Sequence, residues 1–305
     1  MYILKAENIV KQFENHTALS EVSIKVEKGT IFGLLGPNGA GKTTFIRIIN
    51  QITAPDSGSI RLFEEKLKPE HIRNIGYLPE ERGLYKKMKT GEQILYFARL
   101  KGMKKNEAEK NMNMWLEKFG ILSWRNKKLE ELSKGMQQKI QFIITVIHKP
   151  ELLIFDEPFS GFDPVNTDII KKEILALKEN GASVIFSTHN MSSVEEICDN
   201  IALINNSKKI LDGKVSEIKD SRKNNIYEII FEGNFNQFSA SLTASYEIIE
   251  HIRKDGKSKL KIRILNNMST NDLLSLMLKF GNIVSFRESV PSMHDIFIQT
   301  VKQNN

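Results

Sequence analysis

Residues 31–44 read IFGLLGPNGAGKTT, and this stretch decides the fold. It contains the pattern G-x-x-x-x-G-K-[ST], in which glycines let backbone N–H groups converge on phosphate oxygens at a helix N-terminus. The apolar run 31–35 predicts a buried strand before the loop, and the apolar residues within 45–49 predict a helix after it. The predicted phosphate-binding residues are Gly36, Pro37, Asn38, Gly39, Ala40, Gly41, Lys42, Thr43 and Thr44.

Two side chains of this loop carry most of its chemistry. Lys42 can reach the β- and γ-phosphates of a nucleotide as a point charge. The hydroxyl of Thr43 is a hard-oxygen ligand of the kind that Mg²⁺ prefers. The loop therefore predicts a nucleotide site, with Thr43 as one metal ligand.

Two acids close a second apolar run, in residues 152–158, LLIFDEP. Burying adjacent carboxylates is costly unless a cation or a reaction uses them. We expect Asp156 to help hold Mg²⁺ and Glu157 to orient and deprotonate an attacking water. The alternative is that both acids are simply exposed beyond the strand. His189 follows a third apolar run, 183–187, where a loop could aim it at the γ-phosphate, although a single histidine is more often structural. The predicted catalytic residues are Lys42, Glu157 and His189.

A third motif, LSKGMQQ at 132–138, resembles the signature motif of the ATPase subunits of ABC transporters, and the resemblance covers about residues 1–215. A serine hydroxyl, a glycine and a helix N-terminus form a second anion site. The resemblance implies that two subunits pair head-to-tail, so that Ser133 and Gly135 of one subunit close over ATP held by Lys42 of the other. It also implies ATP and Mg²⁺ as cofactors, and ATP hydrolysis coupled to transport across a membrane.

The same resemblance gives roles to three further residues. Phe13 corresponds to the aromatic residue that stacks on adenine, with a core aromatic as the alternative. Asp163 ends the loop 160–163, which resembles the loop that links the two sites across the dimer. Glu80 stands where the family usually has Gln; its added charge beside a triphosphate must be offset by Mg²⁺ or by Arg82. The predicted metal ligands are Thr43, Asp156 and Glu80.

Three stretches indicate a particular group of ABC ATPases, namely GYLPEERGLY (76–85), LSKGMQQK (132–139) and PSMHDIFI (291–298). Together they resemble the ATPases of bacterial ABC-2-type exporters related to sodium-extrusion pumps, which carry a small C-terminal domain. The resemblance implies a homodimer docked on a separately encoded transmembrane permease. No apolar run approaches the ~20 residues of a membrane helix, and the start MYILKAENIVKQF lacks a signal peptide's apolar segment. We therefore expect a cytoplasmic protein, peripheral on the inner face of the cell membrane through the permease.

Composition excludes some classes of protein. The 44 Lys and Arg residues outnumber the 37 Asp and Glu residues, but they are scattered, so no nucleic-acid partner is expected. The single cysteine, Cys198, excludes an internal disulfide.

A soluble ABC ATPase acting in DNA repair or on ribosomes is the main alternative. The first would need a coiled-coil or zinc-bearing insertion, and residues 45–131 contain no cysteine. An ABC ATPase acting on ribosomes would need two ATPase cassettes in one chain, and this chain has one. A third alternative, a P-loop kinase, would have no use for the motif at 132–138.

The order of elements predicts an α/β fold of the ABC ATPase type over residues 1–220, with a mostly parallel sheet flanked by helices. Residues 86–130 turn wholly helical and predict an inserted helical subdomain. The polar stretch 218–225 predicts a linker, and 225–305 a small α+β accessory domain. There a strand at 226–232, a turn at 255–256, a helix at 271–279, a strand at 283–286 and a helix near 292–302 resemble a split βαβ fold. Its role stays open between regulating dimer closure, binding a partner and stabilising the chain.

Overall fold

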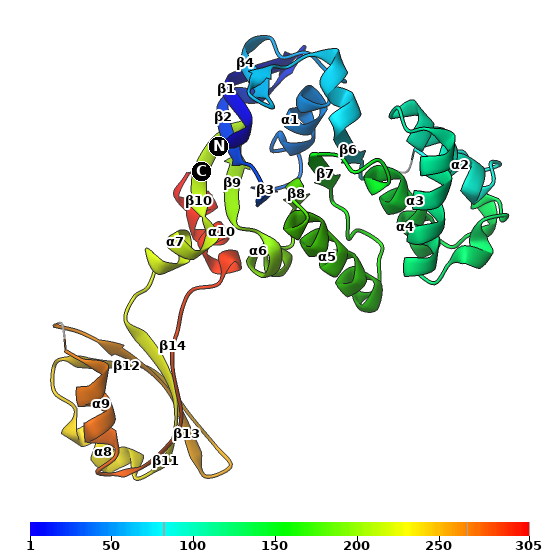
Figure 1. The fold of residues 1–305 in the computed structure, drawn as a ribbon. Helices are drawn as coiled ribbons and strands as arrows, with labels where there is room; N and C mark the ends of the chain where they lie inside the picture. The colour runs from blue at the N-terminus through cyan, green and yellow to red at the C-terminus, as the bar shows by residue number, and fades with distance from the viewer. Residues whose placement is uncertain (82, 267, 305) are drawn as a thin grey trace. The chain divides into compact units, whose positions relative to one another are not determined.

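The computed structural model describes residues 1–81, 83–266 and 268–304. The chain divides into two compact units, residues 1–215 with 299–305 and residues 216–298 (Figure 1). Arg82, which was expected to offset the charge of Glu80, lies outside the described residues.

The main sheet of the first unit has the strand order β10-β9-β3-β8-β7-β6. Neighbouring strands pair in parallel, except that β10 is antiparallel to β9. The strands are β3 (Ile31–Leu35), β6 (Ile75–Leu78), β7 (Leu152–Asp156), β8 (Ser183–Thr188), β9 (Asn200–Asn205) and β10 (Lys208–Lys214). Strands β3, β7 and β8 are buried along their whole length, as expected of apolar strands covered on both faces. Their carboxyl ends meet at one edge, and the predicted, mostly parallel sheet is confirmed.

A second sheet, with the order β2-β1-β4-β5, is antiparallel. Its strands are β1 (Tyr2–Phe13), β2 (His16–Glu27), β4 (Ser57–Leu62) and β5 (Glu65–Lys66). Helix α1 (Lys42–Ile49) lies between the two sheets, with its apolar side chains in one core cluster that both sheets share (Figure 1). Burial of this helix fixes the position of the loop that precedes it.

A helical segment follows β6 along the chain. Its helices are α2 (Thr90–Leu100), α3 (Lys105–Lys118), the short η2 (Leu122–Trp124) and η3 (Leu129–Glu131), and α4 (Lys134–Val146). The ring of Trp115 on α3 meets Phe142 on α4 edge-on at 6.0 Å, and Phe142 stacks on Phe155 of β7 at 5.7 Å. Aromatic packing therefore joins α4 to its helical neighbours on one side and to the main sheet on the other.

The remaining helices of the first unit are η1 (Pro69–Asn74), α5 (Pro164–Glu179), α6 (Met191–Ile197) and α7 (Val215–Asp220), whose first residue closes this unit and whose remainder opens the second. Helix α7 reaches into the stretch 218–225, so the first part of that predicted linker is helical. Among the described residues, every helix is too short or too polar to cross a membrane.

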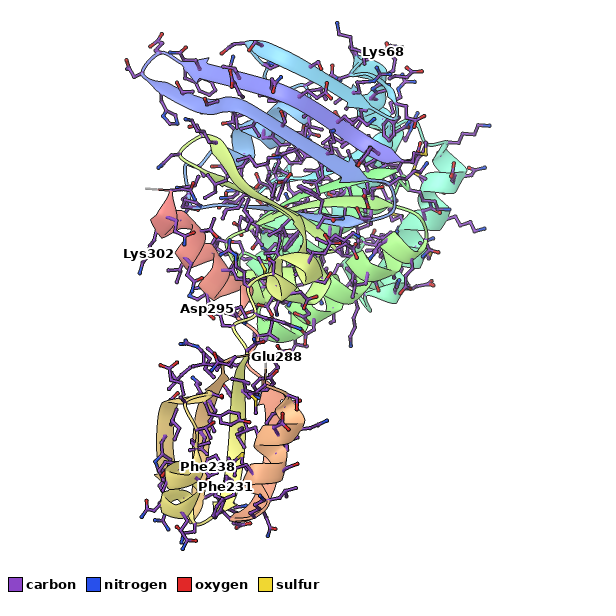
Figure 2. The ribbon with its side chains drawn as sticks, turned by 90° about the vertical axis from the view of Figure 1, so that its left-hand side faces the viewer. Lys68, Phe231, Phe238, Glu288, Asp295 and Lys302 are labelled. Atoms are coloured by element: carbon purple, nitrogen blue, oxygen red, sulfur yellow. The ribbon has the colours of Figure 1, made fainter. Side chains whose placement is uncertain are left out.

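The second unit has the element order β11-α8-β12-β13-α9-β14. The elements are β11 (Ile226–Gly233), α8 (Phe235–Ser241), β12 (Tyr246–Lys254), β13 (Lys257–Ile264), α9 (Thr270–Met277) and β14 (Gly281–Glu288); α10 (Met293–Gln303) follows. The sheet is antiparallel, in the order β12-β13-β11-β14, and alternate residues of its strands pack against α8 and α9. Phe231 and Phe238 meet in this core at 5.6 Å (Figure 2). The predicted small α+β domain of split βαβ order is confirmed.

Candidate active site

The loop between β3 and α1 can be built only with glycines at fixed places. Gly36, Gly39 and Gly41 have φ angles of +149°, +79° and +113°, which L side chains rarely adopt. A Cβ at Gly36 would lie 2.2 Å from the carbonyl oxygen of Ile204, and one at Gly41 would lie 2.3 Å from that of Ala18. The loop thus turns tightly between the two sheets, as the sequence pattern predicts.

Lys42 is the first residue of α1 and is buried beneath this loop. Its Nζ donates hydrogen bonds to the carbonyl oxygens of Gly36 at 2.8 Å and Pro37 at 3.0 Å. Burial lowers the pKa of the Lys42 ammonium. The negative charges of Glu157, Asp156 and Glu80 oppose this shift, because they favour the charged form of the Lys42 side chain.

Asp156, the last residue of β7, is buried and held from two sides. The hydroxyl of Ser187 on β8 donates to one of its carboxylate oxygens, and the Oγ1 of Thr43 donates to the other at 3.3 Å. A hydroxyl and a carboxylate from two rigid elements are the hard-oxygen donors that fit Mg²⁺, which usually binds one or two carboxylates together with substrate phosphates. The alternative of exposed acids past the strand end is wrong for Asp156, which is 2% exposed.

Glu157 follows with a φ of +49°, in the left-handed region that bulky residues rarely occupy. Its side chain is only 12% exposed. The Nδ1 of His189 lies 2.8 Å from Oε1, and the Oγ1 of Thr188 donates to Oε2 at 3.4 Å. Because a carboxylate only accepts, Nδ1 of His189 carries the proton. The His189 side chain is 68% exposed, so it holds the carboxylate from the solvent side.

A cavity of about 360 Å³ brings most of the predicted residues together. The predicted residues that line it are Phe13, Asn38, Gly39, Gly41, Lys42, Thr43, Thr44, Glu80, Asp156 and Glu157. Phe13 is 48% exposed at this cavity, so the alternative of a core aromatic is wrong. Gly36, Pro37 and Ala40 belong to the loop without lining the cavity, and His189 is joined to it through Glu157.

Four residues at this site were not anticipated from the sequence. His16 and Ala18 line the cavity from β2, while Ser187 and Thr188 bond to the two acids. A signal existed for Ser187 and Thr188, since they precede His189 at the end of an apolar run. Parallel pairing places Ser187 beside Asp156, but only the three-dimensional register shows it.

Ser133, Gly135 and Asp163 do not line this cavity. Ser133 is the N-cap of α4 and accepts from the N–H of Met136 at 3.3 Å, and a Cβ at Gly135 would meet open space. Asp163 is the N-cap of α5, where hydrogen bonds from the backbone N–H and side chain of Asn166 lower the pKa of its carboxyl. The structure therefore leaves Ser133 exposed and Gly135 half-buried, both outside the cavity that contains the phosphate loop of their own chain.

Three features define a P-loop nucleotide hydrolase: a glycine-rich loop after β3, a buried lysine beneath that loop, and an acidic pair at the end of β7, two strands away in the same sheet. Comparison with known proteins narrows the class. Residues 19–160 match the family model of the ABC transporter. Residues 213–301 match the model of the C-terminal domain of DrrA1-3-like ATP-binding proteins.

Similar proteins match nearly the whole length of the chain. The uncharacterized ABC transporter ATP-binding protein YhaQ of Bacillus subtilis is 43% identical, with 98% of each chain covered. The linearmycin resistance ATP-binding protein LnrL of the same organism is 36% identical over 71% of this chain and 70% of its own length. A solved structure of the ATP binding subunit of an ABC transporter aligns with a TM-score of 0.68 and 28% identity, covering 72% of this chain and 92% of that one. The chain belongs to the ABC transporter ATP-binding proteins, which bind and hydrolyse ATP.

Proposed function

We propose that this chain energises an exporter as a homodimer of ATPase subunits docked on a separately encoded transmembrane permease. The observation that carries the proposal is the separation of two anion-binding features within one subunit. Ser133 and Gly135 present a capped helix N-terminus, yet they line no part of the cavity that contains Lys42. A second copy, placed head-to-tail, would bring the signature residues of one subunit over the phosphate loop of the other.

The proposed site works mainly by positioning and electrostatics. ATP lies with its phosphates in loop 36–44 and its adenine against Phe13, while Lys42 donates to phosphate oxygens. Glu157 accepts a proton from the water that attacks the γ-phosphorus, and His189 holds the Glu157 carboxylate through its Nδ1–H. The bond between the γ-phosphorus and the bridging oxygen breaks, and ADP and inorganic phosphate leave.

We assign Mg²⁺ to the oxygens of Thr43, Asp156 and Glu80. The 3.3 Å contact between the Thr43 hydroxyl and the Asp156 carboxylate supports this assignment, as does the place of Glu80 on the same cavity. When bound, Mg²⁺ would neutralise charge on the β- and γ-phosphates. The Ser187 hydroxyl keeps the Asp156 carboxylate in place for this role.

The loop that contains Asp163 fits a role across the proposed dimer. Gln138 of α4 donates a hydrogen bond to the carbonyl of Ser160, so this loop is tied to the helix that Ser133 begins. Asp163 is exposed at the start of α5. We infer that the loop and the signature helix approach the partner subunit together.

Mixing two inactive variants tests the arrangement across the dimer. Ser133→Glu places a negative charge where γ-phosphate is expected, and Lys42→Ala removes the phosphate-binding cation. Each variant alone should be nearly inactive, whereas an equimolar mixture should recover about one quarter of wild-type ATPase activity, because half of the dimers keep one intact site. Phosphate release measured over a range of mixing ratios checks this expectation.

The matched control mixes Lys42→Ala with Glu157→Gln. Both changes fall on the same side of a site, so every site of every dimer is damaged and no recovery is expected. Equal behaviour of the two mixtures, whether both recover or both stay inactive, would contradict the proposed exchange of Ser133 between subunits.

The proposed partner is a membrane permease, which places the chain on the inner face of the cell membrane. A second cavity, of about 490 Å³, opens beside residues 77–79 and is lined by apolar side chains of α2, α4 and η1, among them Ile72, Phe97 and Ile144. We infer that a cytoplasmic segment of the permease docks here. The motif resemblance at 76–85, and the relative named for linearmycin resistance, support export as the direction.

We further propose that residues 1–220 form the nucleotide-binding domain, with a helical subdomain at about 86–130, and that 225–305 form an accessory domain.

Purification from detergent-solubilised membranes tests the proposed permease partner. We expect a protein with several apolar spans of about 20 residues to copurify and to be identified by its mass. Copurification of ribosomal proteins or DNA-repair factors, with no membrane protein, would favour a soluble ABC ATPase instead.

A further inference from the structure

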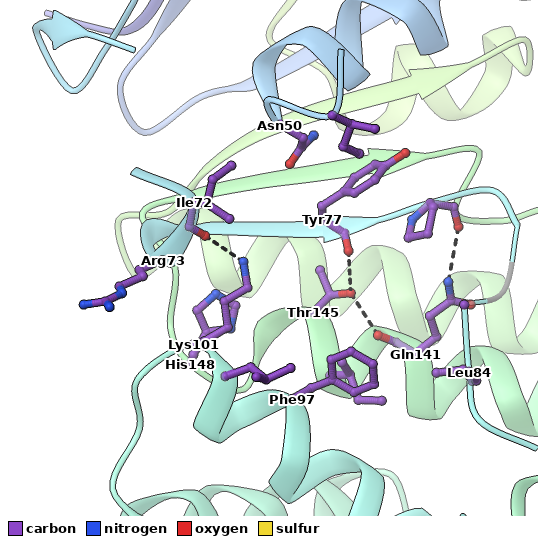
Figure 3. Close-up of a pocket in the computed structure, with 15 residues that line it drawn as sticks. Asn50, Ile72, Arg73, Tyr77, Leu84, Phe97, Lys101, Gln141, Thr145 and His148 are labelled. Carbon is purple, nitrogen blue, oxygen red and sulfur yellow. Dashed lines mark hydrogen bonds between the residues drawn. The ribbon is translucent and has the colours of Figure 1, made fainter. Parts of the chain in front are cut away.

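Strand β6 forms the edge of the main sheet and separates two cavities. Glu80, just past its end, lines the nucleotide cavity, whereas Tyr77 and Pro79 line the second, apolar cavity (Figure 3). An edge strand has carbonyl groups that no neighbouring strand can satisfy. On β6 these carbonyls face α4 and the end of α2.

Polar side chains of α4 and of the end of α2 lie beside the outward carbonyls of this edge. Gln141 Nε2 donates to the oxygen of Pro79 at 3.3 Å (Figure 3). Thr145 Oγ1 lies 3.5 Å from the oxygen of Tyr77, but its single proton has a nearer acceptor in the carbonyl of Gln141 at 2.9 Å. These carbonyls recur at every second residue, at Tyr77 within β6 and at Pro79 just past its end, and Gln141 and Thr145 lie one helical turn apart on α4. We call these contacts, together with those at Ile75, the β6 ladder.

Ile75 is the inner end of the ladder. Lys101, the C-cap of α2, donates to its carbonyl at 2.8 Å and to that of Ile72 at 2.6 Å. His148, just past the end of α4, has its Nε2 3.3 Å from the same Ile75 oxygen. Burial lowers the pKa of Lys101 to about 8, and burial with the nearby Lys101 charge lowers that of His148 to about 4. The neutral His148 ring donates through Nε2–H, since its partner is a carbonyl.

The ladder connects two parts of the site that are distant along the chain. Its outer end holds Pro79, the residue before Glu80, at the nucleotide cavity. Its donor Gln141 lies on α4, whose N-cap is Ser133, and the 13 residues of that helix make a rigid element about 20 Å long. Gln141 therefore links the residue before Glu80 to the helix that carries the signature residues.

We propose that Gln141 and Lys101 are positioning residues for ATP hydrolysis. Gln141 couples the Pro79–Glu80 turn to the signature helix α4, and Lys101 holds the opposite end of β6 at Ile75. This inference rests on the proposed function in its assignment of Glu80 and Ser133. A ladder that only satisfies edge carbonyls would contribute to folding and leave turnover unchanged. The two roles differ in what they do to kcat and KM.

Gln141→Met is the main test, because methionine keeps the length of the side chain and removes its donor. We expect kcat for ATP hydrolysis to fall about tenfold, while KM for ATP changes less than about twofold. Gln93→Met is the matched control: Gln93 is also a buried glutamine of the helical segment, but its side chain accepts from the N–H of Tyr85 and, among the described residues, its amide nitrogen donates to no carbonyl of β6. We expect this variant to keep the wild-type kcat. Thermal unfolding of both variants reports any loss of stability.

Lys101 gives a second, independent readout. Lys101→Arg keeps donors for the carbonyls of Ile72 and Ile75 and should retain most of kcat, whereas Lys101→Met should lower kcat as Gln141→Met does. The inference is overturned if Gln141→Met lowers kcat no more than Gln93→Met, or if Lys101→Met matches Lys101→Arg. Ser133→Glu is measured in the same series. Full activity of Ser133→Glu would refute the proposed signature role itself, and an inactive Ser133→Glu beside a fully active Gln141→Met would refute the ladder alone.

Discussion

Replacing Glu157 by Gln will leave ATP binding close to that of the wild type and reduce hydrolysis about 10²-fold or more. Glutamine has nearly the same shape, so it can stay near Thr188 and His189, but its amide cannot accept a proton from the attacking water. The carboxylate that it replaces is held by His189 Nδ1 at 2.8 Å, at the end of a buried strand beside Asp156. Binding by titration calorimetry and phosphate release at saturating ATP separate the two effects.

Glu151→Gln is the matched control for this change. Glu151 is an exposed acid just before β7, where it pairs with Lys28 at 3.5 Å, far along the strand from the nucleotide cavity. Exposed pairs of this kind contribute little to stability. We expect turnover to be unchanged in this variant. Wild-type turnover in Glu157→Gln would remove Glu157 from the role of base.

Lys42→Ala should weaken ATP binding by about 10- to 100-fold, because hydrogen bonds to a charged group contribute about 1.5–3 kcal/mol. The change removes the cation that the three carboxylates of the site face. It also removes two hydrogen bonds that hold the carbonyls of Gly36 and Pro37, so the loop itself loses support. Titration calorimetry with ATP measures the affinity, and thermal unfolding checks that the protein stays folded.

Lys68→Ala serves as the control for Lys42→Ala. Lys68 is an exposed lysine (Figure 2). It pairs with Glu65 at 2.8 Å and does not line the nucleotide cavity. Its removal should leave ATP affinity unchanged. Equal affinities of the Lys42→Ala variant and the wild type would contradict the assignment of the phosphate-binding loop.

The parts of the site that could be predicted from the sequence are those that local pattern determines. The loop 36–44 requires glycines for its backbone angles, and apolar runs predicted β3, β7 and β8, although β7 and β8 each extend one residue further, to Asp156 and Thr188. The same local patterns predicted the order of strands and helices after residue 225. These features depend on residues close together along the chain.

Contacts between distant segments could not be predicted in the same way. The bond from Ser187 to Asp156 depends on the register of two parallel strands, and the side chain of His16 reaches the cavity from the second sheet. Gln141 and Thr145 gave no signal, because a polar residue on an amphipathic helix is ordinarily solvated. Their partners are backbone carbonyls, which leave no trace in the sequence.

The backbone of Glu157 has a consequence for the evolution of the protein. A glutamate at a φ of +49° costs about 1–2 kcal/mol relative to a glycine at the same place. Selection for thermal robustness alone would therefore drive this position toward glycine or asparagine and leave a sturdier protein that cannot turn over its nucleotide. We expect glutamate to be kept at position 157 only while selection acts on turnover. At this position, stability is therefore lost in exchange for catalysis.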